Sequence, residues 1–84
     1  MNKVDIYTSK TCNPCKMLKA YLAKENFKDG DIVYKDIGDF SDDMVKFDII
    51  KVPTIVLFTE EGTKKFSGEL PVLLKAIKNY LKEK

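Results

Sequence analysis

The chain has two cysteines, which are separated by two residues in the stretch Thr8–Lys16 (TSKTCNPCK). A Cys-x-x-Cys pair can bind a metal ion, cross-link the chain or exchange electrons through a reversible disulfide. Electron exchange needs one accessible thiolate and a second thiol close enough to attack the mixed disulfide that forms. The spacing alone leaves these three chemistries open.

The elements on either side of this pair follow from the pattern of apolar residues. β-branched and aromatic residues predict strands over residues 3–8 and 32–37. Between them, a helix is expected from residue 14 to residue 26, because apolar residues recur there at spacings of three and four. Its predicted buried stripe consists of Met17, Leu18, Tyr21 and Leu22.

The second half of the chain predicts two more strands and two more helices. Ser41 is a suitable N-cap for a short helix over residues 42–47. The continuous apolar run over residues 54–59 is typical of a strand buried on both faces, and a turn ending at Gly62 leads to an edge strand over 63–67. Pro71 suits the first turn of a last helix, whose expected buried face is Leu70, Leu73, Leu74, Ile77 and Leu81.

The order of elements is therefore β-α-β-α-β-β-α. Strands joined through helices are expected to pair in parallel, and the tight turn at Gly62 makes the last pair antiparallel. The sequence thus predicts an α/β fold with a four-stranded mixed sheet flanked by helices. At 84 residues, we expect residues 1–84 to form a single domain.

Composition and charge restrict the partners and the location. The 15 basic and 13 acidic residues give a net charge of +2 and form no dense cationic block, so nucleic acid is not expected as a partner. The N-terminal segment has no apolar run as long as a signal sequence or a membrane span. We therefore expect a cytoplasmic protein that does not enter a membrane.

The expected location narrows the chemistry of the cysteine pair. Cytoplasmic thiols are kept reduced, so a lone close pair is expected to be catalytic or metal-binding rather than a structural cross-link. Structural zinc sites usually have four Cys or His ligands, and this chain has two cysteines and no histidine. We therefore expect no metal site. The alternative to a redox enzyme is a protein that uses the same fold as a metal-binding or interaction module.

Two motifs resemble the thioredoxin and glutaredoxin superfamily. Cys12-Asn13-Pro14-Cys15-Lys16 follows a predicted strand at the start of a helix, and Val52-Pro53-Thr54 precedes a buried strand. The resemblance covers nearly the whole chain. Its length and the segment IYTSKTC are similar to glutaredoxins, whereas the proline before the second cysteine, VPTIVLF and Phe66-Ser67-Gly68 are similar to thioredoxins. The chain resembles a small, glutaredoxin-sized thioredoxin-like protein.

Two positions differ from the patterns of these families. Thr11 stands where thioredoxins have a tryptophan before the first cysteine. The paired glycines and acidic residue that help glutaredoxins to bind glutathione are reduced to Gly68-Glu69. The second difference makes a glutathione-dependent glutaredoxin the alternative interpretation.

The expected roles of the cysteines follow from their places on the helix. Cys12 lies at its N-terminal end, where free backbone amides and the helix dipole stabilise an anion, so we expect Cys12 to be the nucleophile. Cys15 is one turn further on and shares a face with Cys12, which suits the resolving thiol. Lys10 and Lys16 could add a weak attraction for the thiolate.

Further roles are implied by the resemblance. Asn13 and Pro14 would tune the redox potential, and Pro53 would form a cis peptide bond that leaves Val52 free to pair with substrate main chain. Thr11 and Gly68 would belong to the same substrate-binding surface.

Thioredoxins also keep a buried acid that accepts a proton from the second cysteine. Asp5 is one position further from Cys12 than that pattern requires, and a shift of one residue reverses the face of a strand. A structural or exposed Asp5 is therefore favoured over a catalytic one, and Tyr7 is expected to serve packing.

The resulting hypothesis is a thiol-disulfide oxidoreductase that reduces protein disulfides and donates electrons through the Cys12–Cys15 couple, with no tightly bound cofactor. Its expected partners are disulfide-bearing proteins, ribonucleotide reductase among the candidates, and either a reductase or glutathione as the upstream donor. The chain is expected to be a monomer.

Overall fold

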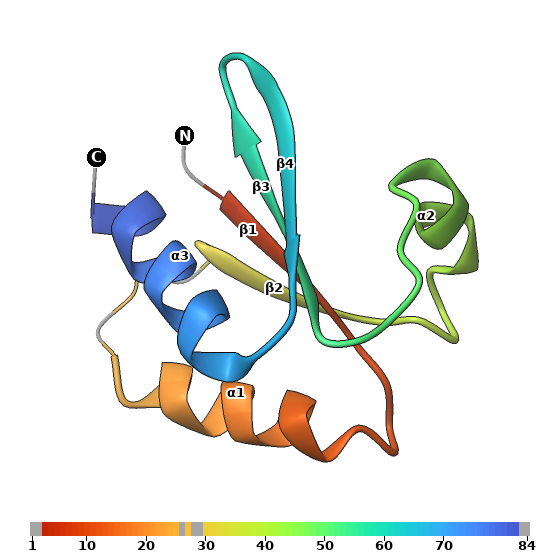
Figure 1. Cartoon of the computed structure of the whole chain (residues 1–84), viewed down its shortest axis with the longest axis horizontal. Coiled ribbons are helices and arrows are strands. Elements are labelled where there is room, and N and C mark those ends of the chain that lie inside the picture. The colour runs from red at the N-terminus through yellow and green to blue at the C-terminus, as the bar shows by residue number, and fades with distance from the viewer. Residues whose placement is uncertain (1–2, 26, 28–29, 83–84) are drawn as a thin grey trace.

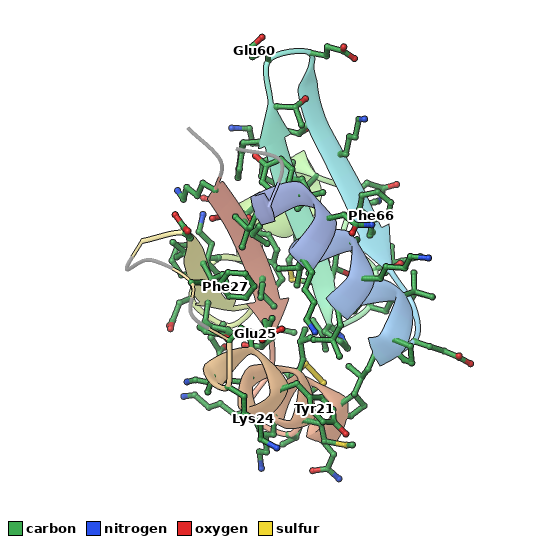
Figure 2. All side chains as sticks on the ribbon, turned by 90° about the vertical axis from the view of Figure 1, so that its left-hand side faces the viewer. Tyr21, Lys24, Glu25, Phe27, Glu60 and Phe66 are labelled. Atoms are coloured by element: carbon green, nitrogen blue, oxygen red, sulfur yellow. A yellow bond between two sulfur atoms is a disulfide. The ribbon has the colours of Figure 1, made fainter. Side chains whose placement is uncertain are left out.

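The structure is a computed structural model that describes residues 3–25, 27 and 30–82 (Figure 1). The first helix ends at Ala23, with Lys24 (labelled in Figure 2) as its C-cap, so it is shorter than predicted; the expected end at residue 26 itself lies outside the described residues. The observed order, β-α-β-α-β-β-α, confirms the prediction. Its elements are β1 (Lys3–Thr8), α1 (Asn13–Ala23), β2 (Ile32–Asp36), α2 (Ser41–Lys46), β3 (Thr54–Thr59), β4 (Gly62–Ser67) and α3 (Leu70–Lys82).

The four strands form one mixed sheet in the order β2-β1-β3-β4. β1 and β2 are parallel, and β3 and β4 form an antiparallel hairpin, as predicted. The prediction was wrong for β3, which pairs antiparallel with β1 although a helix precedes it. The segment that contains α2 does not return along the sheet, so β3 starts at the end where β1 and β2 finish. Thr54 therefore lies opposite Tyr7, and the residues just before β3 share an end of the sheet with the cysteine segment.

α1 and α3 cover one face of the sheet, and α2 lies to the other side of the molecule (Figure 1). Alternate residues of the central strands point to the two faces. One core cluster contains Val4, Ile6, Leu18, Leu22, Ile55, Leu57, Leu73, Ile77 and Leu81. The smaller cluster on the opposite face contains Tyr7, Ile49 and Val56.

The buried stripe of α1 differs from the prediction. Leu18 and Leu22 are buried, but Met17 and Tyr21 are 49% and 44% exposed. A helix turns by about 100° per residue, so these two side chains point away from the face that carries Leu18 and Leu22. The third buried residue of α1 is Cys15, which continues the spacing of three and four.

The start of α2 also differs from the prediction, by one residue. Phe40 is the N-cap, and its carbonyl accepts hydrogen bonds from the amides of Asp43 and Met44 at 3.0 and 3.3 Å. Ser41 is thus the first helical residue, and no side chain caps the helix. The last helix agrees better, because Leu73, Ile77 and Leu81 are buried, whereas Leu70 and Leu74 are only partly buried.

Candidate active site

Cys12 and Cys15 form a disulfide at the start of α1, with their Cα atoms 5.2 Å apart. Cys12 is the N-cap of the helix and has extended backbone angles, φ −86° and ψ 105°. Its Sγ accepts a hydrogen bond from the backbone N–H of Cys15 at 3.1 Å. This N–H belongs to the first turn, where the backbone amides have no partner within the helix. The sulfur of Cys12 therefore occupies the place of a side-chain cap.

The two cysteines differ in their exposure. Cys15 is 3% exposed and belongs to the buried stripe of α1, whereas Cys12 is half-buried. A disulfide-bearing protein can approach Cys12 more easily than Cys15. The difference in access agrees with Cys12 as the attacking residue and Cys15 as the resolving one.

The residues between the cysteines lie on the surface. Asn13 and Pro14 are the first two residues of α1, and both are exposed. Proline has no N–H, but a first-turn amide has no helical acceptor, so α1 loses no hydrogen bond at Pro14. The exposed Thr11 lies 3.5 Å from Ser9, measured between their hydroxyl oxygens.

Three residues of the predicted substrate-binding surface lie together at the same end of the sheet. The Val52–Pro53 peptide bond is cis and directly precedes β3. Thr54 pairs with Tyr7 on one side and with Ser67 on the other, so Gly68 follows β4 next to Pro53. The chain leaves β1 towards Cys12 at this end as well. Gly68 has φ +132°, a value that L-residues rarely adopt.

The two lysines near the cysteines, Lys10 and Lys16, line one cavity of about 220 Å³. This cavity lies between α1 and the carboxyl ends of β1 and β2. Lys19 and Tyr34 line it too, and they were not predicted as site residues. The spacing of Lys16 and Lys19, which puts both on one helix face, was the signal in the sequence.

Asp5 is buried, with 1% of its surface exposed, which excludes the exposed position that the sequence allowed. It lies in β1 between Val4 and Ile6, whose side chains pack on the α1 face, so Asp5 points to the opposite face of the sheet. Its carboxylate forms ion pairs with Lys35 at 2.9 Å and with Lys3 at 3.6 Å. The structure thus shows a buried ion pair at Asp5.

Lys35 connects Asp5 to a second carboxylate, on α2. Its Nζ lies 3.4 Å from Oδ2 of Asp43, and the same Oδ2 accepts a hydrogen bond from the hydroxyl of Tyr7 at 2.9 Å. α2 has no fully buried residue, and these polar contacts attach it to the sheet together with the packing of Met44 and Phe47 against the smaller core cluster. Sequence reasoning missed this network, because Tyr7, Lys35 and Asp43 are far apart in the chain and carry no motif.

The network shifts the pKa of its members. Burial, followed by the hydrogen bond to Asp43, raises the pKa of Tyr7 to about 12. The hydrogen bond from Tyr7 lowers the pKa of Asp43, and the contact with Lys35 lowers it further. Burial lowers the pKa of Lys35, but the interactions with Asp5, Tyr7 and Asp43 together outweigh this effect, so its pKa is raised. Near neutral pH, Lys35 is therefore cationic, Asp43 anionic and Tyr7 neutral.

Two properties of the described residues concern other functions, namely metal binding and insertion into a membrane. Residues 3–25, 27 and 30–82 contain no group of three or more Cys, Asp or Glu side chains that could hold a metal ion. No helix in the described part of the chain is long and apolar enough to cross a membrane.

Comparison with solved structures finds thioredoxins. The fold is similar to mitochondrial thioredoxin 3 from Saccharomyces cerevisiae in its oxidised form, at 27% identity and a TM-score of 0.77 over 93% of this chain and 77% of that one. Thioredoxin NaTrxh from Nicotiana alata is 27% identical with a TM-score of 0.73, over 95% and 73% of the two chains. Thioredoxin 1 from Thermosipho africanus is 22% identical with a TM-score of 0.72, over 95% and 94%. The sequence matches no family model and no curated protein.

The fold and the Cys-x-x-Cys disulfide are those of the thioredoxin-like superfamily. Within it, the similar structures are thioredoxins, and together with the Cys12–Cys15 disulfide they support a thiol-disulfide oxidoreductase.

Proposed function

We propose that this protein reduces disulfides of other proteins, with Cys12 as the nucleophile and Cys15 as the resolving thiol. The observation that carries the proposal is the position of the Cys12 sulfur, which caps α1 and accepts the N–H of Cys15 at 3.1 Å. A helix N-terminus stabilises negative charge, so the same donor and the same helix end favour the Cys12 thiolate after reduction.

The first step is an attack on the substrate. The Cys12 thiolate attacks one sulfur of the target disulfide, forms a mixed disulfide and releases the other target sulfur as a thiolate. The half-buried position of Cys12 supports this role, because an attacking sulfur has to reach a disulfide on another protein.

The second step releases the substrate. The Cys15 thiolate attacks the Cys12 sulfur, which forms the Cys12–Cys15 disulfide and frees the second target thiolate. Two electrons pass from the protein to the target, and two protons end on the target thiols. The burial of Cys15 limits its contact with other disulfides and leaves Cys12 as its partner.

The substrate surface that the resemblance implies consists of Val52, Pro53 and Gly68, with Thr11 beside the cysteines. The first three share the end of the sheet from which the chain leaves β1 towards Cys12. The backbone of Val52 would pair with substrate main chain there. Asn13 and Pro14, exposed in the first turn of α1, would tune the potential of the couple.

The upstream donor in this proposal is a thioredoxin reductase, and the thioredoxins among the similar structures support this choice. We further propose that the protein acts as a cytoplasmic monomer and that ribonucleotide reductase is one of its substrates.

A coupled assay tests both the activity and the donor. The oxidised protein is mixed with insulin as the disulfide substrate, NADPH and either thioredoxin reductase or glutathione with glutathione reductase. We expect NADPH oxidation with thioredoxin reductase, and its loss in the Cys12→Ser variant. NADPH oxidation in the glutathione system but not with thioredoxin reductase would favour the glutaredoxin alternative. A wild-type rate no higher than that of Cys12→Ser in both systems would refute the activity.

A further inference from the structure

A pocket rich in lysine lies beside the disulfide, on the side of α1 that faces β2. We call it the basic pocket. It has a volume of about 220 Å³, and its lining includes Ser9, Lys10, Lys16, Lys19, Tyr34 and Asp36. Three cationic side chains and one anionic side chain therefore surround a space large enough for a carboxylate group.

The lysines of the basic pocket are available to a ligand. In the described part of the chain, Lys10, Lys16 and Lys19 take part in none of the ion pairs, which involve Lys3, Lys35 and Lys78. Asp36, the acid in the lining, already accepts the N–H of Gly38 on Oδ1 at 2.7 Å.

Lys19 is held in place at this site. Its Nζ lies 5.0 Å from the centre of the Tyr34 ring, within the range of a cation–π contact. Lys16 and Lys19 are three residues apart in α1, so both belong to the same side of the helix. The arrangement presents two ammonium groups from one rigid element.

The basic pocket and the proposed substrate surface lie on opposite sides of β1. The strand order is β2-β1-β3-β4, and Val52, Pro53 and Gly68 adjoin β3 and β4, whereas Tyr34 and Asp36 belong to β2. The cysteine segment, which follows β1, lies between the two. A substrate that pairs with Val52 and brings its disulfide to Cys12 would therefore have the basic pocket on the far side of the cysteine segment, within reach of residues that flank its disulfide.

We propose that the basic pocket binds the carboxylates of acidic residues that flank the target disulfide, so that the protein favours disulfides in acidic segments of its substrates. This proposal rests on the proposed function, because it names the substrate class of the same site. The positive charge of the basic pocket and its position beside Cys15 support this proposal. Salt should weaken the interaction, because the lysines are exposed.

Binding can be measured without any redox step. The ¹⁵N-labelled oxidised protein is titrated with an acidic peptide, rich in Asp, in which serine replaces both cysteines. We expect shifts of the amide signals of Lys16, Lys19 and Tyr34 that weaken at 0.5 M NaCl, and no such shifts with an Asn-for-Asp peptide. Shifts that are absent, or equal for the two peptides, would overturn the proposal even if the protein reduces disulfides well. Equal shifts with inorganic phosphate would show a general anion site and would overturn the peptide assignment.

Turnover then tests the preference. Three peptides carry the same internal disulfide, flanked by Asp, Asn or Lys. We expect the wild type to have a kcat/KM about threefold to tenfold higher for the Asp peptide than for the Asn peptide, as a few exposed charge pairs allow. Lys19→Gln should reduce this ratio, and Lys19→Glu should shift the preference towards the Lys peptide.

Lys75→Gln is the matched control, because it removes one positive charge from the exposed face of α3 and should leave the ratio unchanged. An equal fall in Lys19→Gln and Lys75→Gln would mean that net charge, not the basic pocket, sets the preference, and would overturn the proposal. If the protein reduces none of the peptides, the proposed function fails, and the titration still decides whether the pocket binds acidic segments.

Discussion

The backbone N–H of Cys15 donates a hydrogen bond to Sγ of Cys12 at 3.1 Å, within the turn that the disulfide closes. In the reduced protein the same donor would stabilise a Cys12 thiolate, and the dipole at the start of α1 would add to this effect. We therefore predict that the Cys12 thiol titrates below the ordinary pKa of about 8.5. The rate of iodoacetamide alkylation against pH, measured on the Cys15→Ser variant, reports Cys12 alone. A midpoint at or above 8.5 would contradict the proposed activation.

The different exposure of the two cysteines predicts which of them remains attached to a substrate. With Cys15→Ser, the mixed disulfide at Cys12 has no resolving thiol, so a covalent complex with a disulfide-bearing protein should accumulate. Cys12→Ser should trap little, because Cys15 is 3% exposed. Non-reducing electrophoresis with the same substrate compares the variants. A complex that forms mainly in Cys12→Ser would reverse the assigned roles.

The sequence predicted the elements well where a local pattern determines them. The buried run of β3 and the spacing of Leu73, Ile77 and Leu81 in α3 carry their own periodicity, and the structure shows both elements. The direction of β3 could not be predicted in this way. It depends on whether the segment around α2 returns along the sheet, and α2 is a short helix that buries no residue and so carries little apolar pattern.

In the candidate site, too, some residues could be predicted from local motifs and others could not. Cys12, Cys15 and Pro53 belong to motifs, so their positions in the sequence pointed to them before the structure did. The contacts of Asp5 with Lys35, and of Tyr7 with Asp43, join residues separated by 30 and 36 positions. Neither a spacing rule nor a motif relates such pairs, because only the pairing of β1 with β2 and the packing of α2 bring them together.

The burial pattern of α1 predicts unequal effects of two neighbouring substitutions. Leu18 is fully buried in the larger core cluster, so Leu18→Ala should reduce the free energy of unfolding by about 2–5 kcal/mol. Met17 is 49% exposed, and Met17→Ala should cost less than about 1 kcal/mol. Urea denaturation followed by circular dichroism measures both. Similar losses for the two variants would mean that Met17 belongs to the core after all.

Breaking the buried ion pair between Asp5 and Lys35 should reduce the free energy of unfolding more than breaking a shorter ion pair near the surface. Lys35→Gln leaves the buried carboxylate of Asp5 without its nearest cation, so we predict a loss of about 3 kcal/mol in the free energy of unfolding. The double variant Asp5→Asn with Lys35→Gln should recover part of this loss, because no buried charge remains.

The control is the ion pair of Lys78 with Glu25, which is 2.7 Å long but partly exposed, at 42% and 33% of the two side chains. Lys78→Gln should cost less than about 1 kcal/mol. Urea denaturation at pH 7 gives all three values. If Lys35→Gln costs no more than Lys78→Gln, the burial of Asp5 has no energetic consequence and the prediction fails.

The hydrogen bond from Tyr7 to Asp43 predicts a change in stability with pH. Tyr7→Phe keeps the ring and removes the 2.9 Å contact, so it should reduce the free energy of unfolding at pH 7 by about 1–2 kcal/mol. Tyr21→Phe removes a hydroxyl from a residue that is 44% exposed, and it should have almost no effect. Urea denaturation compares both variants with the wild type.

The pH dependence identifies the contact itself. The pKa of Tyr7 is raised from 10.0 to about 12 in the folded protein, so its contribution is complete below pH 10 and is lost as the pH rises towards 12. The pKa of Asp43 is lowered from 3.8, so its contribution is present above that value and is lost as the pH falls below it. Between neutral pH and either acid or alkaline pH, the free energy of unfolding of Tyr7→Phe should therefore fall by less than that of the wild type. If the free energy of unfolding changes with pH in the same way for Tyr7→Phe and the wild type from pH 3 to 12, the hydroxyl of Tyr7 does not stabilise α2 through Asp43.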